Sequence, residues 1–101
     1  MEDPDDEGAT ALIWACAFGN AEMVRLILDA GAGIDVPSSK DGTTPLYIAA
    51  HFGHVPVVRL LCDRGAKIDK AMNYGTTPLC MAALEGHEPV ARLLCLSLIH
   101  I

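Results

Sequence analysis

Histidine and cysteine side chains are the residues of this chain that could bind a metal ion or act as nucleophiles. The histidines are His51, His54, His87 and His100, and the cysteines are Cys16, Cys62, Cys80 and Cys95. Structural zinc requires four ligands, which commonly come as closely spaced pairs. The chain has no Cys-x-x-Cys pair, Cys80 and His87 would supply only two ligands, and His51 has no ligand at position i+4. We therefore expect no metal site.

The sequence also lacks the patterns typical of catalytic and cofactor-binding sites. Gly31 and Gly33 follow an expected helix, whereas the glycines of a phosphate-binding loop precede one. No serine or cysteine stands in a motif that assigns a general base to it. The sequence predicts no catalytic residue, no cofactor and no enzymatic activity within these residues.

Residues 41–66 are the stretch on which the rest of the chain is patterned. Positions that recur 34 residues earlier include Gly42, Leu46, Ala49, Gly53 and Gly65, matched by Gly8, Leu12, Ala15, Gly19 and Gly31. Positions that recur 33 residues later include Gly75, Thr77, Pro78, Leu79 and Gly86. A period near 33 indicates a repeat protein, in which each unit buries its apolar face only by stacking on its neighbours.

The repeated stretch resembles the ankyrin repeat through its TPLxxAA segment, the Gly-His that follows, a Leu-Leu pair and a closing GAxxD. The resemblance covers roughly residues 7–95 and implies an all-α solenoid of three helix-turn-helix repeats joined by β-hairpin-like fingers. The repeats would span about residues 7–39, 40–72 and 73–95, the last one truncated. The histidine usual after TPL is replaced by Ile13, Tyr47 and Cys80.

The two ends of the chain differ from the repeats. We expect residues 1–6 to form an acidic, disordered leader, and residues 96–101 to be a truncated or non-native tail. The net charge is −6, and removing the five acidic residues among the first seven leaves −1 for residues 8–101. Without a basic stripe, nucleic-acid binding is disfavoured. No apolar run is long enough to predict a membrane helix.

The cysteines lack regular disulfide spacing, and the start of the chain is acidic and unlike a signal peptide. Both features predict an intracellular, cytoplasmic protein.

The spacing predicts short inner helices from about residue 11, after Thr10 as N-cap, and from Pro45 and Pro78. Outer helices would begin near residues 21, 55 and 88. Several side-chain placements follow from the repeat register. Trp14, Cys16, Cys62 and Cys95 are predicted to be core residues, Cys80 to be partly exposed, His54 and His87 to bond local backbone, and Val90, Leu93 and Leu94 to face water or a further repeat.

In the ankyrin family, partners contact the fingers and the inner helices. Transferred by repeat position, the resemblance implies the partner-binding residues Lys40, Asp41, Thr43, His51, Phe52, Asn73, Tyr74, Thr76, Leu84 and Glu85. The equivalent positions of the first repeat are Asp6, Glu7, Ala9, Ala17 and Phe18. His51, Phe52 and Tyr74 are the expected anchors, because aromatic side chains often dominate interfaces. Alternatively, Phe18 and Phe52 pack between neighbouring repeats.

The function that the resemblance implies is a non-catalytic protein–protein interaction scaffold with a concave groove. The partner would be another protein, with neither nucleic acid nor membrane involved, and self-association through an uncapped C-terminal end is a further expectation. Two alternatives stay open at this point: the targeting segment of a longer enzyme, such as a kinase or a ubiquitin ligase subunit, and a structural spacer in a longer repeat array.

Overall fold

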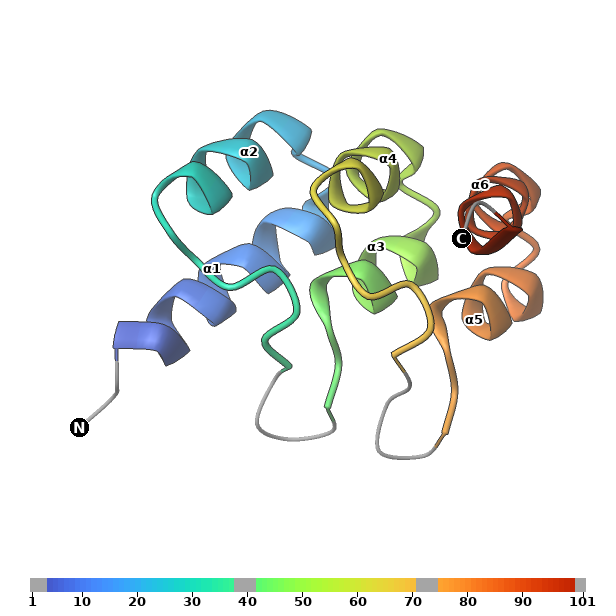
Figure 1. The fold of residues 1–101 in the computed structure, drawn as a ribbon, viewed down its shortest axis with the longest axis horizontal. Coiled ribbons are helices and arrows are strands. Elements are labelled where there is room, and N and C mark those ends of the chain that lie inside the picture. The colour runs from blue at the N-terminus through green and yellow to red at the C-terminus, as the bar shows by residue number, and fades with distance from the viewer. Residues whose placement is uncertain (1–3, 38–41, 71–74, 100–101) are drawn as a thin grey trace.

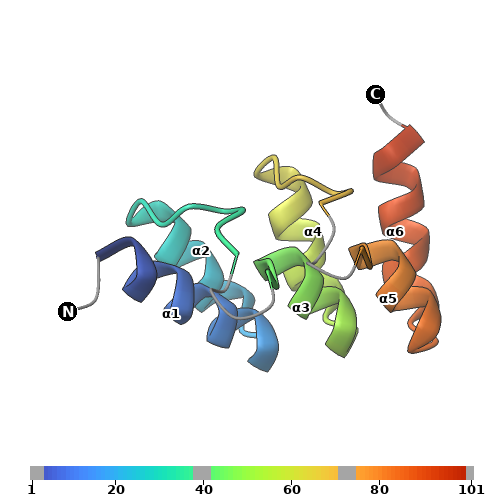
Figure 2. The same ribbon diagram turned by 90° about the horizontal axis from the view of Figure 1, so that it is seen from below.

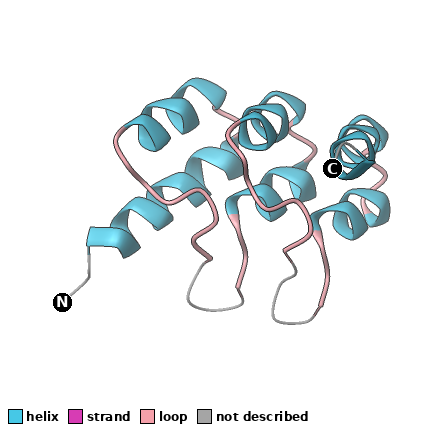
Figure 3. Cartoon of the chain, viewed as in Figure 1, coloured by secondary structure: helices cyan, strands magenta, loops and turns pink. Residues whose placement is uncertain are grey.

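Three antiparallel helix pairs follow one another along the chain in the computed structural model, which describes residues 4–37, 42–70 and 75–99. The pairs are α1 (Pro4–Phe18) with α2 (Ala21–Asp29), α3 (Pro45–Phe52) with α4 (Val55–Asp63), and α5 (Pro78–Leu84) with α6 (Glu88–Ile99). No described residue lies in a strand (Figure 3). The predicted all-α repeat fold is confirmed.

The helices form two layers. Helices α1, α3 and α5 lie side by side in an inner row, and α2, α4 and α6 form an outer row (Figures 1 and 2). The loops that join one pair to the next project from the inner row on one side (Figure 1). The molecule measures 39 Å along its longest axis, the direction in which the pairs succeed one another.

Local sequence explains where the inner helices α3 and α5 begin. Thr44 and Thr77 are the N-caps, and their hydroxyl oxygens accept hydrogen bonds from the backbone N–H of Tyr47 and Cys80, each at 3.2 Å. A proline follows each threonine, at a position where its missing N–H costs no hydrogen bond. These starts agree with the prediction from the Thr-Pro pairs.

Helix α1 begins earlier than the sequence predicted. It starts at Pro4, so residues 4–6 of the expected disordered leader form its first turn and Thr10 is an interior residue. Proline is favoured at the first helical position, where its missing N–H costs no hydrogen bond. The expectation of a helix start near residue 11 was wrong. Residues 1–3 lie outside the described residues.

The core lies between the two layers and consists of aliphatic side chains. Its largest fully buried members are Leu12, Leu46, Leu61, Leu94, Val24, Val57, Val58 and Val90. Burying such a side chain contributes about 1.5–3 kcal/mol to folding. Cys16 is also fully buried, as predicted from its alignment with Ala50.

Three placements predicted from the repeat register are wrong. Val90 and Leu94 are buried and Leu93 is half-buried, because this side of α6 packs against α4 and α5. Cys95 is exposed, on the side of α6 that no described element covers. Trp14 is exposed as well, since α1 packs mainly on α2 and α3. Helix α6 also runs on to Ile99, through the first four residues of the expected tail.

Candidate protein-binding surface

Two histidines fix the inner helices relative to the next repeat. His54 Nε2 hydrogen-bonds the carbonyl oxygen of Ala17 at 2.9 Å, and His87 Nε2 makes the same contact with His51, also at 2.9 Å. The bonded residues are 37 and 36 positions apart, so the prediction of a local backbone bond was wrong. His54 and His87 directly precede the outer helices α4 and α6, and each imidazole reaches the last turn of the inner helix of the previous repeat, α1 or α3.

The loops between repeats are joined as well. The Asp35 carboxylate accepts a hydrogen bond from the Lys67 backbone N–H at 2.9 Å, and Lys70 Nζ donates to the Asp35 carbonyl oxygen at 3.1 Å. Between the outer helices, Arg64 and Asp29 form an ion pair at 2.8 Å. These contacts hold successive repeats in one register although the usual histidine after TPL is absent.

Four of the ten predicted partner-binding residues, Lys40, Asp41, Asn73 and Tyr74, lie outside the described residues. Thr43 is only 6% exposed, because it lies just before the buried start of α3. It therefore offers a partner little surface, and its assignment as a partner-binding residue stays a prediction. Thr76 is half-buried.

The other four predicted residues lie at the C-terminal ends of α3 and α5. Phe52 is 48% and Leu84 76% exposed, Glu85 is exposed and His51 is half-buried. The imidazole of His51 meets the Phe52 ring edge-on, with the ring centroids 4.7 Å apart. The structure therefore brings His51 and Phe52 together at the end of one inner helix, with Leu84 at the end of the next.

Helix α1 extends this apolar surface with two aromatic side chains. Phe18 is 74% exposed and stacks on Trp14, which is 59% exposed, with the ring centroids 5.7 Å apart. We refer to Trp14, Phe18, His51, Phe52 and Leu84 as the inner-helix surface. Sequence reasoning missed Trp14 because the register pairs it with Ile48 and Met81, which are half-buried.

The inner-helix surface has the chemistry of an interface. Its side chains are aromatic or aliphatic, none of them is lysine or arginine, and the exposed Glu85 directly follows Leu84. Exposed aromatic side chains that gather on adjacent elements are typical of surfaces that bind other proteins. The alternative interpretation, that Phe18 and Phe52 pack between repeats, does not fit their exposure.

Other reactive groups form no second site in the part of the chain that the structure describes. No group of three or more histidine, cysteine or acidic side chains lies close enough there to hold a metal ion. Hydrogen bonds from Thr77 lower the pKa of the exposed Cys80 thiol, whereas burial raises the pKa of Cys16 to about 12. Among the described helices, none is both long and apolar enough to cross a lipid bilayer.

Comparison with known proteins agrees with the helical repeat fold described above. The sequence matches the family of ankyrin repeats, in three copies, over residues 30–101, and the single ankyrin repeat over residues 7–39. Ankyrin repeat proteins are generally non-catalytic interaction modules, and neither match is to a catalytic family.

Two curated relatives share one stretch of 32 residues with this chain. They are the DNA-binding protein RFXANK of Mus musculus, at 56% identity, and that of Homo sapiens, at 53%. In each case the match covers 32% of this chain and only 12% of the relative's length. Since the family match extends over residues 30–101, well beyond half of the sequence, this chain belongs to the ankyrin repeat family.

Proposed function

We propose that this chain is a non-catalytic scaffold that binds another protein through the inner-helix surface. The observation that carries the proposal is the exposure of Trp14, Phe18, Phe52 and Leu84 on three adjacent inner helices. Large apolar side chains lose favourable burial energy when they face water, so several of them exposed on neighbouring helices favour association with an apolar partner surface.

The contacts between repeats support a rigid binding surface. The bonds from His54 to Ala17 and from His87 to His51 end on carbonyl groups in the last turns of α1 and α3, within one residue of Phe18 and Phe52. The anchors are thus ordered before a partner arrives. Pre-organisation of this kind lowers the entropic cost of association.

The charge of the surface argues for a protein partner over a nucleic acid. None of its five residues is lysine or arginine, and Glu85, which directly follows Leu84, is acidic. Phosphate groups would find no counter-charge there. The relatives' name refers to DNA binding, but each match is limited to 32 residues and to 12% of the relative's length.

Site-specific photo-crosslinking tests this proposal. A photoreactive phenylalanine analogue placed at Phe18 or Phe52 is expected to crosslink a defined set of proteins in cell extract. The same analogue at Leu26, which is 54% exposed on outer helix α2, is the matched control. Equal crosslinking from Leu26 and from the inner-helix positions would contradict the proposal.

Substitutions sharpen the same test on a captured protein. We expect Phe52→Ala and Leu84→Ala each to weaken its affinity by roughly tenfold, in the range of interface anchors. Leu26→Ala should leave the affinity unchanged. Because all three side chains are exposed, each variant should change the free energy of unfolding by only about 0.5 kcal/mol.

A further inference from the structure

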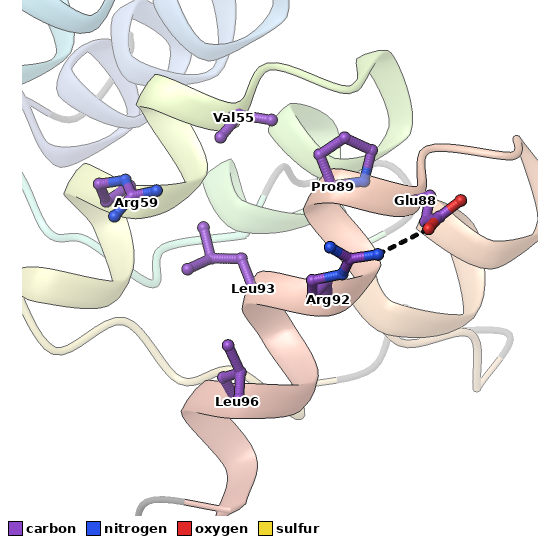
Figure 4. Close-up of a pocket in the computed structure, with 7 residues that line it drawn as sticks. All are labelled: Val55, Arg59, Glu88, Pro89, Arg92, Leu93 and Leu96. Carbon is purple, nitrogen blue, oxygen red and sulfur yellow. Dashed lines mark hydrogen bonds and ion pairs between the residues drawn. The ribbon is translucent and has the colours of Figure 1, made fainter.

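The outer row carries a groove of its own, between α4 and α6 (Figure 4). Its volume is about 580 Å³, and its apolar walls are Val55 from α4 and Pro89, Leu93 and Leu96 from α6. Arg59 of α4 lines it as well (Figure 4). The groove therefore combines an apolar lining with a guanidinium group, on the opposite layer from the inner-helix surface.

A second groove lies between the preceding pair of outer helices, α2 and α4, and differs from the α4–α6 groove in size and lining. It measures about 330 Å³ and is lined by Ala21, Glu22, Arg25 and Leu60. By repeat position, Ala21, Arg25 and Leu60 correspond to Val55, Arg59 and Leu93. The α4–α6 groove is the larger and adds Leu96, which stands where the two earlier repeats have Asp29 and Asp63.

The arginines of the two grooves differ in their partners. Arg25 pairs with Glu22 at 3.8 Å, one turn earlier on α2. In α4 the position of that glutamate is occupied by Pro56, and among the described residues no carboxylate lies within ion-pair distance of Arg59, Asp63 one turn later included. A local substitution of glutamate by proline thus leaves this guanidinium without a counter-charge.

The second arginine of the α4–α6 groove is already neutralised. Arg92 pairs with Glu88 on the same helix at 2.7 Å, as the dashed line in Figure 4 shows. The three charged side chains that line the groove therefore sum to a single positive charge, located at Arg59. A ligand with one negative charge balances it, whereas a doubly charged phosphate group would leave one negative charge uncompensated.

We propose that the α4–α6 groove binds a short protein segment with bulky aliphatic side chains next to one aspartate or glutamate. The aliphatic side chains would pack against Val55, Leu93 and Leu96, and the carboxylate would pair with Arg59. Guanidinium and carboxylate groups match in geometry and form paired hydrogen bonds. This second binding site does not depend on the inner-helix surface and goes beyond the proposed function.

Three short peptides, acetylated and amidated so that their termini carry no charge, test the proposal. One has leucines on both sides of a glutamate, the second replaces the glutamate with glutamine, and the third with phosphoserine. Methyl resonances of Val55, Leu93 and Leu96 report binding in the groove. We expect the glutamate peptide to bind about three- to fivefold more tightly than the glutamine peptide, as for a solvent-accessible ion pair.

Two variants and one control locate the site. Arg59→Gln should abolish the preference for glutamate, and Leu96→Asp, which restores the residue type of the other repeats, should weaken both peptides. Arg25→Gln alters the equivalent arginine of the α2–α4 groove and should change neither. Equal binding of the glutamate and glutamine peptides to the unaltered chain would overturn the proposal. So would tighter binding of the phosphoserine peptide, resonance shifts confined to the inner-helix surface, or no shift with any peptide.

Discussion

The middle repeat and the two flanking repeats use the same positions in different ways. Val57 of α4 is fully buried, whereas Met23 at the equivalent position of α2 is exposed. On the other side of the stack, Ala50 of α3 is fully buried and its equivalent in α5, Ala83, is exposed. Only the middle repeat is covered on both sides within the described residues. Burial in this molecule therefore depends on the neighbouring repeat as much as on residue type.

The largest expected effect contrasts equivalent leucines of α3 and α5. Leu46 is 1% exposed, and Leu79, its counterpart, is half-buried. We expect Leu46→Ala to lower the free energy of unfolding by about 3 kcal/mol, as for a fully buried leucine that leaves a cavity. Leu79→Ala should cost roughly half as much, because its site already borders solvent.

Urea denaturation followed by circular dichroism measures both leucine variants. Equal losses would show that the third repeat packs as tightly as the second, and the contrast between middle and flanking repeats would fail. A native helical signal before denaturation is the control for intact folding.

A smaller difference is expected between two glycines in the turns that join inner to outer helices. Gly53 and Gly86 have nearly the same left-handed backbone, with φ of 73° and 75°. A Cβ at Gly53 would lie 2.6 Å from His87 Nδ1, whereas one at Gly86 would meet no atom within 4 Å. Gly86→Ala should cost about 1 kcal/mol for the backbone conformation alone. Gly53→Ala should cost about 2 kcal/mol, because it also displaces the imidazole from the His51 carbonyl.

The double variant Gly53→Ala with His87→Ala is the control for this explanation. Without the imidazole, the added methyl group has no clash at that ring, so the two changes should cost less together than the sum of their separate effects. Simple additivity would indicate that the His87 ring moves aside freely, and that the bond between repeats is weak.

The sequence predicted most of the fold because the period near 33 and the Thr-Pro pairs are local signals. The Thr-Pro pairs mark where α3 and α5 begin, because the threonine caps the helix and the proline suits its first turn. The start of α1 at Pro4 was not predicted, because Thr10 also matches the pattern of an N-cap. A threonine can equally occupy the interior of a helix when its neighbours favour helix formation.

The binding surface was less predictable, because exposure depends on neighbours. Inner-helix ends are equivalent in every repeat, and the side chains of Phe52 and Leu84 are exposed there. That they contact a partner stays a prediction. The register misplaced Trp14, whose equivalents have a covering repeat on a side that α1 leaves open. Thr43 is buried, because it lies just before the buried start of α3, and the repeat register does not reveal this burial. The long-range partners of His54 and His87 became apparent only once the repeats were stacked.

The smallest expected effect contrasts two thiols through their dependence on pH. Burial raises the pKa of Cys16 from 9.0 to about 12, whereas hydrogen bonds from Thr77 lower the pKa of the exposed Cys80. The unfolded chain loses the Cys16 proton near pH 9 and the folded chain only near pH 12. The stabilisation is thus complete below pH 9 and is lost progressively as the pH rises towards 12.

At pH 10 this loss should amount to about 1 kcal/mol relative to pH 8. Cys16→Ala is the matched variant, because Ala50 fills the equivalent, fully buried position. Its unfolding free energy should decline less between pH 8 and pH 10 than that of the unaltered chain, and the difference between the two slopes isolates Cys16 from other titrating groups. Iodoacetamide should meanwhile label Cys80 in the folded protein and Cys16 only after unfolding. Rapid labelling of Cys16 in the folded protein would mean that α1 opens while the rest of the stack stays folded. The adjacent repeat would then stabilise the first repeat less than it stabilises the second.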